Sequence, residues 1–198
     1  MSANAKVFTL KSMIHVFALG LLIFQYYLAA LDQLGGDPVK SIIHFTGNGA
    51  FNLLLITLLI SPLSQRFKAG YLLQTRRLLG LYAFVYAVLH FLSFIAFDLQ
   101  FEWQLLVKEI VERPYITVGF IALVWLVPMA VTSHGKIKRM MKSRWQTLHY
   151  GNYAIVLFVA IHFYWSVKSE LIEPSIYLFI TLTLLMLRKA KIRRWLNI

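Results

Sequence analysis

Six apolar stretches, each about as long as a lipid bilayer is thick, constrain the fold of this chain more than any other feature. They lie near residues 13–31, 43–62, 78–97, 115–132, 149–167 and 174–188. A helix needs about 20 apolar residues to cross the hydrocarbon core, and 59% of the chain is hydrophobic while only 14% is charged. The sequence therefore predicts an all-α membrane protein, with one domain over residues 1–198 built as a six-transmembrane-helix bundle. The first stretch has no Ala-x-Ala cleavage site before Asp32, so we expect it to be a retained span.

The charged residues between the stretches predict the orientation of the bundle. With the N-terminus placed in the cytoplasm, every lysine and arginine falls on the cytoplasmic side except Lys40, Lys108, Arg113 and Lys168. All eight acidic residues fall on the other side. Cytoplasmic connections of membrane proteins are enriched in lysine and arginine, so we expect both termini in the cytoplasm. Topology and attraction to anionic lipid headgroups then explain the net charge of +12, and nucleic acid is not an expected partner.

The connections between the stretches are expected to be mainly turns and loops. Gly35-Gly36-Asp37-Pro38 is a turn signal, and Pro62 is expected to close the second span. Residues 103–111 are a candidate for a short helix lying in the membrane interface. The basic connections are expected to be irregular, at residues 64–77, 134–148 and the tail 188–198.

Histidines within the apolar stretches point to a buried metal centre. The run from Arg144 to Lys168, predicted to be one helix, holds His149 and His162, and the third stretch holds His90. Ionisable side chains inside a span are costly and commonly mark functional sites. The chain has no cysteine, which excludes cysteine-ligated iron–sulfur clusters, covalent c-type haem and thiol catalysis. Haem is therefore the first candidate.

Depth in the membrane pairs two of these histidines. His90 follows Arg77 by 13 residues, and His162 follows His149 by 13 residues. At the helical rise, both lie roughly 20 Å from the cytoplasmic edge. Neutral imidazoles on facing helices can ligate one haem iron from both sides. The alternative interpretation is two unrelated polar residues bonded to neighbouring carbonyls.

The inner level of the bundle carries a different set of side chains. His149 lies there, roughly 140° around a straight helix from His162. Both can address one neighbour only if the helix is distorted, for example by a π-bulge; otherwise they address different sides. Arg76 and Arg77 stand at this level on the third stretch, and a guanidinium suits a phosphate or carboxylate rather than iron. The inner level is thus predicted to hold a haem with another ligand or a phosphate-bearing cofactor.

The remaining histidines carry weaker predictions. His44, at the outer mouth of the second stretch, is a candidate for binding a quinone headgroup or a haem propionate, and equally an ordinary interface residue. His15, shallow on the first stretch, is interpreted as an interfacial polar residue, and His134 as a solvated loop residue.

The order of several short motifs over nearly the whole chain resembles the ferric-reductase-like transmembrane family. Within it, the chain is similar to the haem-binding membrane subunits of bacterial periplasmic methionine sulfoxide reductase systems. The motifs are Gly36-x-Pro38 with His44-x-Thr46-Gly47, Ser61-Pro62-Leu63, Arg76-Arg77-x-Leu79-Gly80, His90, Arg113-Pro114-Tyr115, and Arg144-Trp145-x-x-Leu148-His149 with His162. The wider family carries two histidines on each of two helices. An arginine here replaces the inner histidine of the third span, so the resemblance does not imply a second bis-histidine haem.

The resemblance implies cofactors, partners and a location. These are haem b, a possible FMN, electrons from the quinone pool or a cytoplasmic flavin reductase, and delivery to MsrP, a periplasmic molybdopterin subunit that reduces methionine sulfoxide in proteins. The implied location is the bacterial inner membrane. We expect His90, His162 and His149 to bind haem, the first two as iron ligands. We also expect Arg76 and Arg77 to bind a flavin phosphate. Sulfoxide chemistry is expected on the partner, because this chain offers no cysteine nucleophile or molybdenum ligand.

Two alternative functions follow from the same sequence. One is a stand-alone transmembrane ferric reductase, although such relatives usually carry a nucleotide-binding domain and none fits in 198 residues. The other is a small transporter or a structural membrane subunit, supported by the scarcity of charge in the spans. Against that second alternative stand the matched histidines and the absence of broken helices with acidic residues at the midplane. Pro128 is the only proline expected well inside a span.

Overall fold

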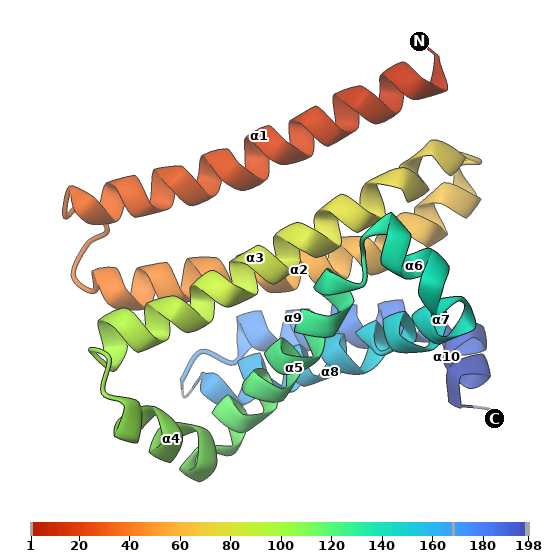
Figure 1. Cartoon of the computed structure of the whole chain (residues 1–198). Coiled ribbons are helices and arrows are strands. Elements are labelled where there is room, and N and C mark those ends of the chain that lie inside the picture. The colour runs from red at the N-terminus through yellow and green to blue at the C-terminus, as the bar shows by residue number, and fades with distance from the viewer. Residues whose placement is uncertain (1, 168, 197–198) are drawn as a thin grey trace. The chain divides into compact units, whose positions relative to one another are not determined.

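The computed structural model describes residues 2–167 and 169–196, and every regular element in those ranges is helical (Figure 1). The elements are α1 (Ala3–Ala30), α2 (Pro38–Arg66), η1 (Gly70–Thr75), α3 (Arg76–Ser93), η2 (Phe94–Asp98), α4 (Trp103–Glu112), α5 (Pro114–Val131), α6 (Gly135–Met141), α7 (Ser143–Tyr150), α8 (Asn152–Ser166), α9 (Ile172–Met186) and α10 (Lys189–Leu196). The prediction of an all-helical protein is therefore confirmed. Lys168, which the sequence placed on the outer side, lies outside the described residues.

Four helical segments among the described residues are long and apolar enough to cross a membrane. They are Ala3–Ala30, Pro38–Arg66, Gly70–Asp98 and Pro114–Val131. The fifth and sixth predicted spans correspond to α8 and α9, which have 15 residues each. The multi-pass character is confirmed, whereas the number of six spans and the side of each terminus remain predictions.

The helices group into two compact units, the first ending at Leu106 and the second beginning at Val107. In the first unit, α2 and α3 pack side by side along their lengths, and α1 contacts both of them. One cluster of buried side chains in this unit draws on all three helices. Its members are Ala18, Leu22, Ala50, Tyr82 and Tyr86.

The turn predicted before the second span is present and begins α2. Gly35 has φ = 85°, a left-handed backbone conformation that glycine adopts without steric cost. The side chain of Asp37 accepts a hydrogen bond from the N–H of Lys40 at 2.9 Å, and Pro38 occupies the first helical position. An aspartate cap followed by proline is the arrangement that best satisfies a helix N-terminus, which explains why the helix starts here.

Polar side chains join α1 to α3 inside the first unit. The hydroxyl of Tyr86 donates to the backbone carbonyl of Ala18 at 2.7 Å, and Tyr26 shares a hydrogen bond of 2.7 Å with Ser93. Nδ1 of His15 and the hydroxyl of Tyr82 are 2.5 Å apart. Within a bilayer a polar group must find its partner inside the protein. These bonds therefore fix the position of α1 against α3, and His15 is a helix-pairing residue.

We expect Tyr86→Phe to destabilise the first unit by about 1 kcal/mol, because interhelical hydrogen bonds in membranes contribute about 0.6 to 1.7 kcal/mol. The ring of Tyr86 is 3% exposed, so the substitution removes only the hydroxyl from a packed site. Reversible unfolding in mixed detergent micelles measures the change. Tyr27→Phe, at a position 58% exposed, is the matched control and should have no effect. Equal changes in both variants would contradict the assignment.

In the second unit, α8 packs against both α5 and α9. The predicted helix from Arg144 to Lys168 is interrupted: α7 ends at Tyr150 and α8 begins at Asn152, with Gly151 between them. A Cβ on Gly151 would lie 2.7 Å from atoms of the Trp125 indole. The glycine thus allows α5 to approach closely, and its low helix propensity weakens the helix at that point. The prediction of one continuous helix is wrong at this residue.

The sequence left open whether the helix between His149 and His162 is distorted, for example by a π-bulge, or whether the two histidines address different sides. In the described residues the π-helical turn occurs at Phe94–Asp98, directly after α3. Gly151 is the irregular point between the two histidines.

Several predicted boundaries are also wrong. Pro62 does not end its helix, because α2 continues through it to Arg66. The connections predicted to be loops contain η1, α6 and α7, and the tail forms α10. Hydropathy detects where a helix leaves the lipid rather than where it ends, so it misses polar turns and short basic helices. The short helix expected at residues 103–111 is present as α4.

Candidate functional site

His90 lies on α3 and is held by the neighbouring helix of the same unit. Its Nδ1 is 2.9 Å from the backbone carbonyl oxygen of Ile43 on α2. A carbonyl oxygen can only accept, so Nδ1 must carry the proton and the ring's lone pair is on Nε2. This is the neutral tautomer that a metal-binding histidine uses, with the other nitrogen donating to a carbonyl.

His162 lies on α8 and is held in the same manner in the second unit. Its Nδ1 is 2.7 Å from the backbone carbonyl oxygen of Tyr115 on α5. The same argument places the proton on Nδ1 and the lone pair on Nε2. His90 and His162, which depth alone had paired, therefore share a tautomer and a type of orienting partner.

His149 is held differently, by side chains of its own unit. The hydroxyl of Thr132 donates to the carbonyl of Pro128 at 2.7 Å, and Nε2 of His149 is 3.1 Å from the same hydroxyl oxygen. The hydroxyl proton is committed to the carbonyl, so Nε2 is the donor of the 3.1 Å bond. His149 thus has its proton on the nitrogen that His90 and His162 leave deprotonated.

An aromatic and cationic stack covers His149. The indole of Trp145 lies 4.0 Å from the imidazole, ring centroid to ring centroid, at an interplanar angle of 25°. Its Nε1 donates to the carbonyl of Thr132 at 3.0 Å, and Nζ of Lys138 lies 4.4 Å from the indole centroid. Sequence reasoning missed Trp145 and Thr132 as partners of His149. The spacing of four residues between Trp145 and His149 was the available signal.

The two arginines predicted to bind a phosphate lie together at the start of α3. Arg76 is the first residue of that helix and is partly buried, whereas Arg77 is exposed. The pair suits an anion, because a guanidinium binds phosphate in two parallel hydrogen bonds. Binding of a flavin phosphate by this pair stays a prediction.

Three other basic or histidine side chains, His44, His134 and Arg188, differ in their surroundings. His44 is exposed on α2, and its part in binding a quinone or a propionate stays a prediction. His134 caps α6, with Nδ1 accepting from the N–H of Lys136 at 3.3 Å. Arg188, assigned by sequence to a solvated tail, is only 5% exposed after the end of α9. A buried guanidinium is tolerated only where it is compensated, so Arg188 is part of the packed structure.

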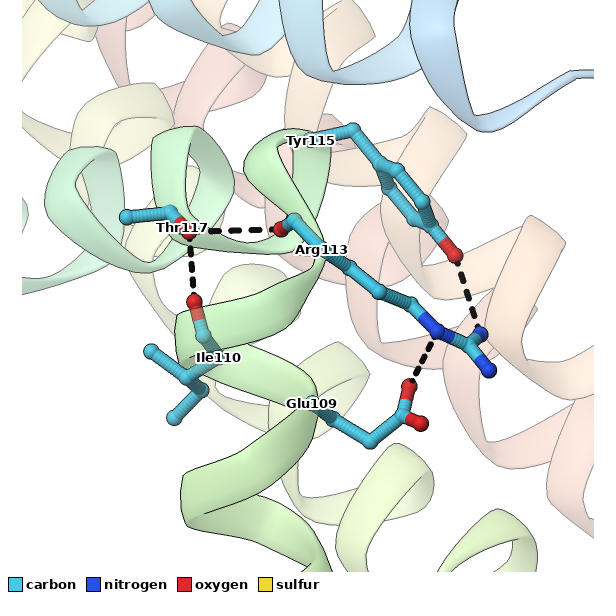
Figure 2. A network of polar contacts seen from close by, with 5 residues as sticks. All are labelled: Glu109, Ile110, Arg113, Tyr115 and Thr117. Carbon is cyan, nitrogen blue, oxygen red and sulfur yellow. Dashed lines mark hydrogen bonds and ion pairs between the residues drawn. The ribbon is translucent and has the colours of Figure 1, made fainter.

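The corner between α4 and α5 fixes the residue that holds His162 (Figure 2). Nε of Arg113 is 2.9 Å from a carboxylate oxygen of Glu109, and its Nη1 donates to the hydroxyl of Tyr115 at 3.2 Å. The hydroxyl of Thr117 lies within hydrogen-bond distance of the carbonyls of Ile110, at 2.5 Å, and Arg113, at 3.2 Å. The backbone of Tyr115, which accepts from His162, is therefore set by a bonded corner.

The chain belongs to the ferric-reductase-like transmembrane family, since the family described as "Ferric reductase like transmembrane component" matches residues 45–160. It is 42% identical over 180 residues to the "Protein-methionine-sulfoxide reductase heme-binding subunit MsrQ" of Xanthomonas axonopodis pv. citri (strain 306), covering 88% of this chain and 83% of that protein. The protein of the same name from Cronobacter sakazakii (strain ATCC BAA-894) is 40% identical over 197 residues, 98% of both chains. Within the family, the chain groups with MsrQ, as the order of motifs predicted.

Proposed function

We propose that this chain is the haem b-binding membrane subunit of a methionine sulfoxide reductase system and passes electrons outward across the bacterial inner membrane. One observation carries the proposal: His90 and His162 are each tethered through Nδ1 to a backbone carbonyl, which puts the lone pair on Nε2. The similarity to MsrQ proteins, which are named for binding heme, supports the same cofactor.

The residues present fit a haem. Two neutral imidazoles form a donor set suited to iron, and a carbonyl on the other ring nitrogen fixes the ring and raises its basicity. His90 and His162 would hold the group, which when bound supplies one-electron redox chemistry. The chain itself orients the imidazoles through the carbonyls of Ile43 and Tyr115, and its apolar helices exclude water. His149, bonded to Thr132, would act at the inner level.

The proposed topology has six spans with both termini in the cytoplasm. α8 and α9, with 15 residues each, are roughly 22 Å long at the helical rise, whereas the hydrocarbon core is about 30 Å thick. α7 directly precedes α8 and adds length at one end. The basic side chains of α6 and α10 support a cytoplasmic position for these short helices.

The proposed partners follow the direction of electron flow. Electrons would enter from the quinone pool or a cytoplasmic flavin reductase and leave to the periplasmic molybdopterin subunit MsrP, on which sulfoxide is reduced. Arg76 and Arg77 would bind the phosphate of an FMN, and His44 a quinone headgroup or a haem propionate. The support for these assignments is residue chemistry: guanidinium groups for phosphate, and an exposed imidazole on α2.

The direct test is a pyridine haemochrome assay with a protein concentration, which gives haem per chain. We expect protein purified after expression with ample haem to carry haem b. Protein without haem absorption would contradict the proposal. Electron delivery is tested by adding methionine sulfoxide to membranes with and without MsrP; turnover should require the partner.

The family description favours one alternative, a stand-alone ferric reductase. Ferric chelates offered to the same membranes distinguish the two functions. Ferric reduction that is independent of the partner and comparable in rate would favour the alternative.

A further inference from the structure

The two tethered histidines are held by the same arrangement, repeated once along the chain. In both cases the accepting carbonyl lies 47 residues before the histidine. In both cases a glycine lies four residues after the accepting carbonyl: Gly47 after Ile43, and Gly119 after Tyr115. Adding 72 to the residue numbers of Ile43, Gly47 and His90 gives those of Tyr115, Gly119 and His162. The same shift takes Arg77 to His149. One copy lies on α2 and α3, and the other on α5 and α8.

Helix geometry explains why the fourth residue matters. In an α-helix the N–H of residue i+4 donates to the carbonyl of residue i, so that residue stands beside the acceptor. The imidazole must approach the same carbonyl and therefore passes directly over the i+4 position. A side chain there competes with the ring for one space.

The space beside the imidazole is too small for a Cβ at Gly119 and very tight at Gly47. A Cβ on Gly119 would lie 2.6 Å from Nδ1, 2.9 Å from Cε1 and 3.0 Å from Cγ of His162. On Gly47 a Cβ would lie 3.0 Å from both Nδ1 and Cε1 of His90. Carbon atoms pack at about 3.5 to 4.0 Å, so an added methyl group would displace the imidazole of His162 from its present position and would shift that of His90 by a smaller amount. Glycine lowers the stability of a helix by about 1 kcal/mol relative to alanine. At these two positions the glycine also leaves room for the imidazole ring.

We propose that Gly47 and Gly119 are positioning residues that allow His90 and His162 to form their Nδ1–H···O=C bonds and so set the orientation of both imidazoles toward a bound haem. This inference rests on the proposed function. It adds two residues that touch neither iron nor substrate but determine where each ligand nitrogen points.

The test compares Gly47→Ala and Gly119→Ala with Gly20→Ala, a helical control on α1 whose added Cβ would meet no atom within 4 Å. The readouts are haem per chain, the ferric low-spin electron paramagnetic resonance signal and the midpoint potential. We expect Gly119→Ala to lose at least half of its haem, because the whole ring edge is displaced. Gly47→Ala, with its looser contact, should retain haem but shift the resonance signal and the potential. Gly20→Ala should match the parent protein.

Circular dichroism and size-exclusion elution show whether each variant is folded. If Gly119→Ala does not fold, Gly47→Ala decides the question alone. Unchanged resonance signals and potentials in both folded variants would overturn the inference, as would the same shift in Gly20→Ala. His90→Ala and His162→Ala separate this inference from the proposed function. If those two variants keep haem, the ligand assignment fails; if they lose it while the glycine variants match the parent, only the positioning role fails.

Discussion

Replacing either His90 or His162 with alanine is expected to lower haem per chain by tenfold or more. Under the proposed assignment each substitution deletes one of two iron ligands, and a single imidazole inside an apolar bundle holds haem weakly. The carbonyl of Ile43 or Tyr115 also loses its imidazole donor. Reduced-minus-oxidised spectra of the purified variants measure the loss.

The double variant tests whether both residues serve one centre. Residues that act on the same site have non-additive effects, so His90→Ala combined with His162→Ala should be no worse than either alone. His134→Ala is the matched control, because His134 caps α6 and should leave haem content unchanged. Additive, partial losses would indicate two separate centres.

His149→Ala is expected to keep the haem held by His90 and His162 but to slow reduction from the cytoplasmic side at least tenfold. His149 lies roughly 20 Å from His162 along the chain at the helical rise, and its Nε2 is bonded to Thr132. Stopped-flow reduction by a cytoplasmic-side donor, followed at the haem band, measures the rate. Loss of all haem in His149→Ala, with His90→Ala fully loaded, would show that the haem lies at the inner level instead.

Arg77→Ala extends this test to the proposed flavin phosphate. If the inner level binds FMN, the variant should lose flavin and slow reduction as His149→Ala does, because a charge-assisted contact is gone. Arg77→Lys should recover only part of the effect, since lysine keeps the charge but not the planar fork. Flavin quantification on each variant gives the answer, and full flavin retention in Arg77→Ala would exclude this role.

The fold class could be predicted from the sequence because its physical basis is local. Lipid solvation acts on runs of residues, so apolar windows predicted the helices even where their ends were wrong. The extension of α2 past Pro62 and the helices α6 and α10 could not be seen, because short basic helices and polar helix ends need no apolar run. The interruption at Gly151 depends on the close approach of Trp125, a tertiary contact.

The sequence selects candidate site residues but not their geometry, and the ligand role of those residues stays a prediction. Depth along each helix selected His90 and His162, and a histidine inside an apolar run is conspicuous. The carbonyls that orient them lie 47 residues away, and a backbone carbonyl has no signature in the sequence. The stack of Lys138, Trp145 and His149 likewise depends on how α6 and α7 fold back toward Thr132.

Pro128 within α5 and Gly151 between α7 and α8 are two points of the second unit where helical hydrogen bonding is weakened. Pro128 has no N–H to donate within α5. Gly151 separates α7 from α8 and lies against Trp125 of α5, and Trp125 precedes Pro128 by three residues. After Pro128, Thr132 is bonded to both Trp145 and His149. Before Pro128, Tyr115 holds His162. The orientations of the two histidines are therefore set by stretches of α5 that lie on opposite sides of Pro128.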